Sequence, residues 1–114
     1  MHFIIGDIGN TSTRICLLNK KSRIVKSIFL NTKKIFIKGY IKKIFKKLIK
    51  KDLKKEILFS SVVPLAFKKI RDNFKNSDYK FFEVKQFNLK KLIKLNIKNV
   101  NQLGSDRIVN SIEG

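Results

Sequence analysis

Cysteine, proline and tryptophan are nearly missing from this chain of 114 residues, which contains one cysteine, one proline and no tryptophan. A lone cysteine, Cys16, cannot form an intrachain disulfide, which argues against a disulfide-rich secreted scaffold and favours a reducing compartment. No apolar run approaches the roughly 20 residues that span a bilayer, and residues 1–5 are too few for the apolar core of a signal peptide. We therefore expect one cytoplasmic domain, long enough to bury about two-thirds of its unfolded surface.

Acidic residues are also scarce, because 8 Asp and Glu stand against 27 Lys and Arg and give a formal net charge of +19. Such a charge is compatible with binding to nucleic acid or to an anionic membrane. The lysines are nevertheless spread over the whole chain, which favours ordinary solvated side chains without a dedicated polyanion. Most aromatic residues occupy positions typical of a core and do not alternate with the lysines as base-stacking platforms would: Phe36, Phe45, Phe59, Phe67 and Phe74.

The most informative stretch is Gly6-Asp7-Ile8-Gly9-Asn10-Thr11-Ser12-Thr13-Arg14, which lies between two apolar runs. The runs, residues 3–5 and 15–18, predict two buried strands. The glycines and Asn10 between them favour a tight hairpin turn that contains a positive φ.

This hairpin has the groups that a phosphate site needs. The backbone N–H groups and the three hydroxyls at residues 11–13 would face one concavity suited to an anion, and Arg14 would add a positive charge. Asp7, at the end of the first strand, could hold a Mg²⁺ that bridges phosphate oxygens. The stretch therefore predicts a nucleotide-phosphate site, although many similar hairpins bind nothing and use Asp or Asn only to cap their own backbone.

Residues 23–30 predict a third strand, which would complete an antiparallel meander. Residues 33–51 predict one amphipathic helix, capped at Asn31-Thr32, with lysines opposite its apolar face. We expect that apolar face to pack on the sheet, and binding of this helix to a membrane surface is the less favoured alternative.

Residues 57–59 predict a buried strand of the kind that pairs in parallel, with Ser60-Ser61 as its polar end. Pro64 begins a second helix, and residues 79–84 predict the fifth strand. The apolar face expected for that helix consists of Ala66, Phe67, Ile70 and Phe74. The order β-β-β-α-β-α-β predicts an α/β fold with a mixed sheet and helices on its faces.

Residues 86–102 give no clear pattern, whereas Gly104-Ser105 favours the start of a further helix. Asp106 lies in its expected first turn, where an acid also suits the helix dipole without any catalytic role, and Arg107 follows it. Gly114 comes shortly afterwards, so we expect the chain to be truncated near the start of this helix.

Three blocks taken together resemble type III pantothenate kinase, a family of the acetate and sugar kinase/Hsp70/actin superfamily. They are Asp7-Ile8-Gly9-Asn10-Thr11-Ser12, Ser60-Ser61-Val62-Val63-Pro64 and Gly104-Ser105-Asp106-Arg107-Ile108-Val109-Asn110, in the order and approximate spacing of that family. The resemblance covers residues 1–114, roughly the first half of a family member. It implies a ribonuclease-H-like, actin-type N-terminal nucleotide-binding lobe, with the second lobe absent from this chain.

The resemblance also implies an activity, the ATP-dependent phosphorylation of pantothenate to 4'-phosphopantothenate in coenzyme A biosynthesis. It implies that Asp7 to Arg14 bind ATP with Mg²⁺, that Gly104 to Arg107 bind pantothenate, and that Asp106 is the general base for the substrate hydroxyl. It further implies a monovalent cation (K⁺ or NH₄⁺), whose ligand is not in this chain, and a partner that is either a second lobe in trans or a second copy in a homodimer.

Two departures from the family pattern predict little activity from this chain alone. Ile97-Lys98-Asn99-Val100 stands where family members carry a pattern like Y-D-N-P, whose tyrosine contributes to the pantothenate pocket. The family's second half, with another Asp-Gly-Thr phosphate motif, is missing. The alternative function is that of a non-catalytic, degenerate remnant that binds nucleic acid or another polyanion through its lysine-rich surface.

Overall fold

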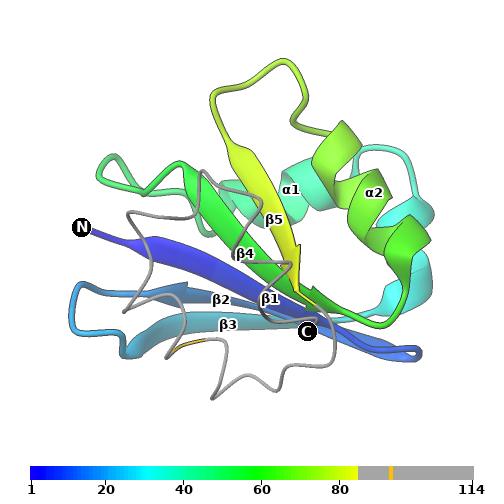
Figure 1. Ribbon diagram of the computed structural model, residues 1–114, viewed down its shortest axis with the longest axis horizontal. Coiled ribbons are helices and arrows are strands. Elements are labelled where there is room, and N and C mark those ends of the chain that lie inside the picture. Colours follow the sequence, from blue (N-terminus) through cyan, green and yellow to red (C-terminus); the bar gives the residue numbers. More distant parts are fainter. Residues whose placement is uncertain (85–92, 94–114) are drawn as a thin grey trace.

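The computed structural model describes residues 1–84 and residue 93, and they form one mixed sheet with helices. The strands are β1 Phe3–Ile8, β2 Ser12–Leu18, β3 Ile24–Asn31, β4 Glu56–Ser61 and β5 Lys80–Val84. Their order in the sheet is β3-β2-β1-β4-β5 (Figure 1). β1 pairs antiparallel with β2 and β2 with β3, whereas β4 lies parallel to both β1 and β5. The predicted fold class is confirmed.

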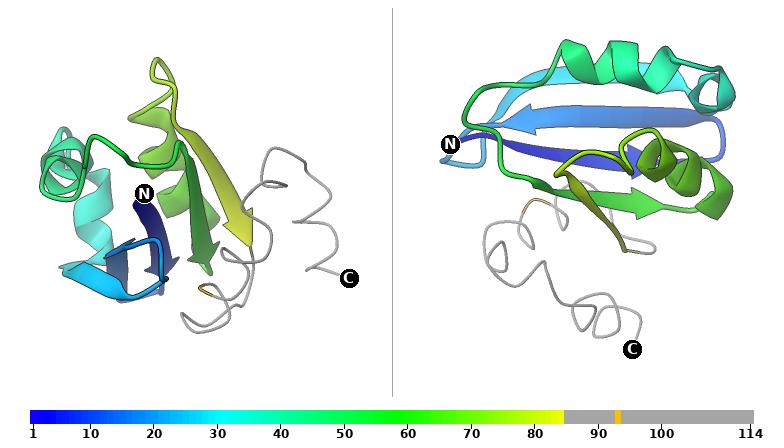
Figure 2. Two further views of the ribbon diagram at one scale, coloured as in Figure 1. Left: turned by 90° about the vertical axis from the view of Figure 1, so that its left-hand side faces the viewer. Right: turned by 90° about the horizontal axis from the view of Figure 1, so that it is seen from above.

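Two α-helices, α1 (Tyr40–Lys46) and α2 (Pro64–Asp72), lie on the same face of this sheet, which we call the first face (Figure 2). Strand residues alternate between faces, so Ile4 and Ile8 of β1 join the core beneath the helices, whereas Ile5 belongs to a second cluster on the other, second face. That second cluster comprises Ile5, Cys16, Leu18, Leu58 and Val84. In the described part of the chain, no helix is long and apolar enough to cross a membrane.

Gly6 in β1 leaves space for an aromatic ring from the neighbouring strand β4. A Cβ at Gly6 would lie 2.2 Å from the ring of Phe59, which is fully buried on the first face. Only a glycine leaves room for this ring beside the strand.

The predicted single helix over residues 33–51 is wrong. The chain forms a 3₁₀ helix, Thr32–Phe36, and α1 begins only at Tyr40. The predicted cap is confirmed for the first of these, since the Asn31 side chain accepts a hydrogen bond from the Lys33 N–H at 3.0 Å. Gly39 separates the two helices with a left-handed φ of 79°.

This break also corrects the predicted core. Phe45, Phe59 and Phe67 are buried as expected, and Phe74 packs partly buried against the same cluster. Phe36 is 47% exposed, because the chain changes direction after the 3₁₀ helix and no longer follows a continuous helical face.

The start of the chain is held against the segment that precedes β4. The Met1 amine lies 2.9 Å from the Asp52 carboxylate, and His2 Nδ1 lies 2.7 Å from its other oxygen. Hydrogen bonds from the amine and from His2 lower the pKa of the Asp52 carboxyl to about 2.

Candidate functional site

The hairpin between β1 and β2 has a shorter turn than the sequence predicted. β1 continues to Ile8 and β2 begins at Ser12, so the turn between the two strands consists of residues 9–11. The Gly9 N–H donates to the Ser12 carbonyl oxygen at 2.9 Å and closes it. A Cβ at Gly9 would lie 3.0 Å from that same oxygen, a tighter contact than most side chains accept.

The predicted positive φ in this turn is wrong. Within residues 1–84 and 93, positive φ occurs only at Ser22 and Gly39, and neither lies in the hairpin. The turn closes through the Gly9 hydrogen bond without a left-handed residue. The side chains of Asn10, Thr11 and Ser12 are exposed at its tip, where an anion can reach them.

The structure separates Thr13 from the other hydroxyls of the hairpin. Thr13 is 1% exposed on the first face, and its hydroxyl lies 2.9 Å from that of Thr32. The Thr32 hydroxyl donates to the Gly9 carbonyl oxygen at 2.7 Å, and the Thr32 N–H donates to the Thr11 carbonyl oxygen at 2.9 Å. Thr13 therefore joins the hairpin to the start of the 3₁₀ helix. Ile8 is likewise buried in the first-face core, so its side chain does not reach a ligand at the hairpin tip.

On the second face, strand register places a cation, an anion and a hydroxyl side by side. Asp7 of β1 pairs with Arg14 across β2 and with Ser60 across β4. Adjacent strands are about 4.8 Å apart, so these three side chains are nearest neighbours on one face. We call Arg14, Asp7 and Ser60 the polar row. Phe29 of β3 and Val84 of β5 continue the same line toward the two edges of the sheet.

The polar row lies at the carboxyl ends of β1 and β4, where the chain leaves the sheet in different directions. β1 continues into the hairpin with β2, and β4 continues into α2. Ligands of open α/β sheets bind at such a switch point. The next line of register partners toward the middle of the sheet is largely apolar: Ser27, Cys16, Ile5, Leu58 and Phe82.

The ends of β1 and β4 are also tied together by backbone contacts. The Val62 N–H donates to the Ile8 carbonyl oxygen at 3.0 Å, and the Ser61 hydroxyl accepts from the Val63 N–H at 3.0 Å. Pro64 then begins α2, as predicted. The second sequence block therefore lies directly beside the first.

The charges of the polar row affect each other. Burial raises the pKa of the Asp7 carboxyl, and the nearby Arg14 guanidinium partly offsets this effect. In the part of the chain that the structure describes, no ion pair joins the two side chains. Arg14 instead donates from Nη2 to the Ser27 hydroxyl at 3.3 Å, and its guanidinium carbon lies 5.0 Å from the centre of the Phe29 ring.

The residues present fit a Mg²⁺ that is shared with phosphate. Among the described residues, no group of three or more His, Cys, Asp or Glu side chains could form an all-protein metal site. Mg²⁺ commonly uses one or two carboxylates and takes its other ligands from phosphate and water, which suits Asp7 as a single carboxylate.

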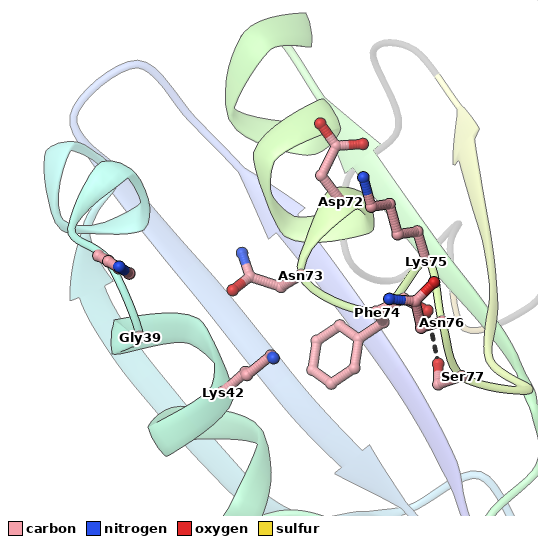
Figure 3. A pocket seen from close by; sticks show the side chains of 9 residues that line it. Gly39, Lys42, Asp72, Asn73, Phe74, Lys75, Asn76 and Ser77 are labelled. Carbon is pink, nitrogen blue, oxygen red and sulfur yellow. Dashed lines mark hydrogen bonds between the residues drawn. The ribbon is translucent and has the colours of Figure 1, made fainter.

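A hollow among the described residues lies elsewhere, between α1 and the end of α2 (Figure 3). It has a volume of about 600 Å³ and contains no residue of the polar row. Lysines contribute much of its lining, together with Phe74 and the polar turn after α2: Lys38, Lys42, Lys75, Asn73, Asn76 and Ser77. We place the candidate site at the polar row, because strand pairing brings charged and hydroxyl side chains together there, at the carboxyl ends of β1 and β4.

The structure does not test every predicted site residue. Gly104, Ser105, Asp106 and Arg107 lie outside the described residues, as do residues 97–100. The sequence interpretation missed Phe29 and Ser27, which contact Arg14. The signal was available in principle, because alternation along residues 23–30 places these two residues on one face.

Comparisons with known proteins identify the family and agree with this fold. A family model described as type III pantothenate kinase matches residues 3–114. The curated type III pantothenate kinase of Pelagibacter ubique (strain HTCC1062) is 44% identical over 110 residues, which cover 96% of this chain and 44% of that protein. The chain thus spans less than half the length of this relative.

A solved structure supports the fold alone. A protein described as a sugar kinase from Cytophaga hutchinsonii superposes with a TM-score of 0.51 at 14% identity, covering 75% of this chain and 36% of the other. The likeness is to the actin-like ATPase fold, as the sequence resemblance implied.

Proposed function

Because the chain belongs to the type III pantothenate kinase family, we propose that it provides the nucleotide-binding lobe of an enzyme that phosphorylates pantothenate with ATP. The observation that carries this proposal is the polar row at the ends of β1 and β4, beside the exposed turn of residues 9–11. A carboxylate, a guanidinium and hydroxyls meet there at the point where α/β sheets bind ligands.

Each group has a role in phosphoryl transfer, which depends mainly on positioning and neutralisation of charge. The exposed groups of Asn10, Thr11 and Ser12 bind phosphate oxygens, and Arg14 neutralises part of their charge. Asp7 holds the Mg²⁺, which supplies further neutralisation when bound. Thr13 keeps the turn in place through Thr32.

The substrate side of the site rests on the third sequence block. Gly104 to Arg107 bind pantothenate, Arg107 pairs with its carboxylate or with phosphate, and Asp106 accepts the proton of its primary hydroxyl. A second lobe in trans or a second copy of the chain completes the cleft, with a K⁺ or NH₄⁺ ion bound outside residues 1–114. We place the enzyme in the cytoplasm, in coenzyme A biosynthesis.

The test is ATP-dependent phosphorylation of pantothenate by the purified chain, with and without the remaining half of the Pelagibacter relative added in trans. We expect turnover that requires the added half. Asp106→Asn should lower the rate about 100- to 10,000-fold, the usual contribution of a general base. The matched control, Asp78→Asn, removes an exposed carboxylate and should leave the rate unchanged. Turnover that survives Asp106→Asn would contradict the proposed base.

A further inference from the structure

Phe29 is an exposed aromatic residue with a specific neighbour. It belongs to β3, the edge strand of the sheet, and 69% of its side-chain surface is accessible. Its register partner is Arg14, whose guanidinium carbon lies 5.0 Å from the centre of the ring. This distance is within the range of a cation–π contact. The roles proposed above for the polar row do not use Phe29.

Ser27 supports Arg14 from a second side. Its hydroxyl accepts a hydrogen bond from Arg14 Nη2 at 3.3 Å and lies 3.3 Å from the Cys16 sulfur. Cys16 is fully buried, so the hydroxyl is itself held in place. A guanidinium with a ring against it and a hydroxyl at one end loses most of the rotational freedom of a long arginine side chain.

The restraint keeps the charge of Arg14 on the second face, beside Asp7. An arginine on an uncovered sheet face would otherwise extend into solvent, where its charge is screened and its position undefined. No ion pair with Asp7 uses the guanidinium within residues 1–84 and 93, and the hydrogen bond to Ser27 uses only Nη2. Nε is buried, so Nη1 is the donor of Arg14 that remains for a ligand anion.

We propose that Phe29 is a positioning residue that holds Arg14 for the phosphate groups of the nucleotide. The inference rests on the proposed function, because it requires a polyphosphate beside the polar row. Phe29 acts through Arg14 and makes no contact of its own with the nucleotide.

The experiment is calorimetric titration of the full 114-residue chain with MgATP. Phe29→Ala should weaken binding about 2- to 5-fold, the size of an exposed cation–π contact. Phe29→Tyr keeps the aromatic face and should bind like the unchanged chain. The control Val25→Ala, at a residue of β3 that is 51% exposed, should also bind normally.

A double-mutant cycle separates positioning from a general surface effect. In an Arg14→Gln background, Phe29→Ala should cause no further loss of affinity. An equal loss in both backgrounds would overturn the inference, as would unchanged binding by Phe29→Ala or a change confined to the oligomeric state. If the unchanged chain does not bind MgATP, the proposed function and this inference are both overturned. If the unchanged chain binds MgATP and Phe29→Ala binds it equally well, only the inference is overturned.

Discussion

Asp7 combines a proposed function with a cost in stability. Burial raises the pKa of its carboxyl despite the neighbouring Arg14, so the folded chain disfavours the ionised form that a Mg²⁺ site needs. Above the raised pKa, the folded state must carry this charge, and the free energy of unfolding is lower than it would be with a neutral side chain. Functional residues often carry such a penalty.

We therefore predict that Asp7→Asn stabilises the chain in the absence of metal. Thermal denaturation at pH 7 with EDTA should show a Tm increase of at most about 4 °C, the lower end of what 1 kcal/mol produces in a small domain. The increase should vanish as the pH falls below about 3.9, where the carboxyl is protonated in the folded and unfolded states. Asp78→Asn is the control, and a lower Tm for Asp7→Asn would contradict the prediction.

Gly6 shows how a missing side chain makes room for a buried ring on the neighbouring strand. Its missing side chain leaves room for the Phe59 ring, which would lie 2.2 Å from an added Cβ. We predict that Gly6→Ala lowers the free energy of unfolding by about 1–3 kcal/mol, as overpacking does. In urea denaturation, Phe59→Leu should recover part of this loss when the two changes are combined. Additive losses would show that the ring is not the obstacle.

At the scale of elements, a buried chain of hydrogen bonds connects the hairpin to the 3₁₀ helix. It runs from the Thr13 hydroxyl to that of Thr32 and on to the Gly9 carbonyl oxygen. Thr13→Val keeps the shape of the side chain but leaves the Thr32 hydroxyl without this partner. We predict a loss of about 1–2 kcal/mol in denaturant unfolding, together with faster hydrogen exchange at the Gly9 and Thr32 N–H groups.

The exposed hydroxyl of Thr11 provides the control for this prediction. Thr11 lies in the same turn, and its side chain is exposed to solvent. Thr11→Val should change neither the unfolding free energy nor the exchange rates at Gly9 and Thr32. If Thr13→Val behaved in the same way, the hydrogen-bond chain would have no role in holding the hairpin.

The sequence predicted most elements but not how they end. Five strands and α2 follow from their apolar runs and from Pro64. The helical spacing of apolar residues continues through residues 33–51, so periodicity alone could not reveal the left-handed φ at Gly39. The sequence did not predict how far the two hairpin strands extend. Thr13 is polar but is buried within a strand, where its hydroxyl forms a hydrogen bond with that of Thr32.

The sequence predicted only part of the candidate site, because the rest depends on contacts between distant segments. Asp7 and the turn are consecutive in the sequence and carry recognisable chemistry. Ser60 joins them only through the parallel pairing of β1 with β4, and Phe29 only through the register of β3. Such contacts depend on which strands pair, which local patterns do not specify.

At the scale of the whole molecule, the net charge of +19 affects every binding experiment. A lysine-rich surface attracts any polyanion, including ATP, by long-range electrostatics that salt screens. The hollow lined by Lys38, Lys42 and Lys75 is one place where such binding could occur. Binding at the polar row differs from this attraction, because it should depend on Asp7. The Asp7 carboxylate is negatively charged and cannot attract ATP by its own charge.

One substitution, Asp7→Asn, therefore distinguishes nonspecific attraction of ATP from binding of MgATP at the polar row. Asp7→Asn removes a negative charge, so it should strengthen nonspecific attraction of ATP slightly or leave it unchanged. If Asp7 holds the Mg²⁺ that bridges the phosphates, the same change should weaken binding of MgATP. The Asp78→Asn variant removes the same charge from an exposed position and serves as the matched control.

A nucleotide site at the polar row is therefore tested best by the dissociation constant of MgATP for the unchanged chain and for Asp7→Asn, measured by calorimetry at physiological salt. We predict that Asp7→Asn weakens binding at least about 10-fold, a difference of about 1.4 kcal/mol, while Asp78→Asn binds like the unchanged chain. Equal or tighter binding by Asp7→Asn would show that the polar row does not bind the nucleotide phosphates.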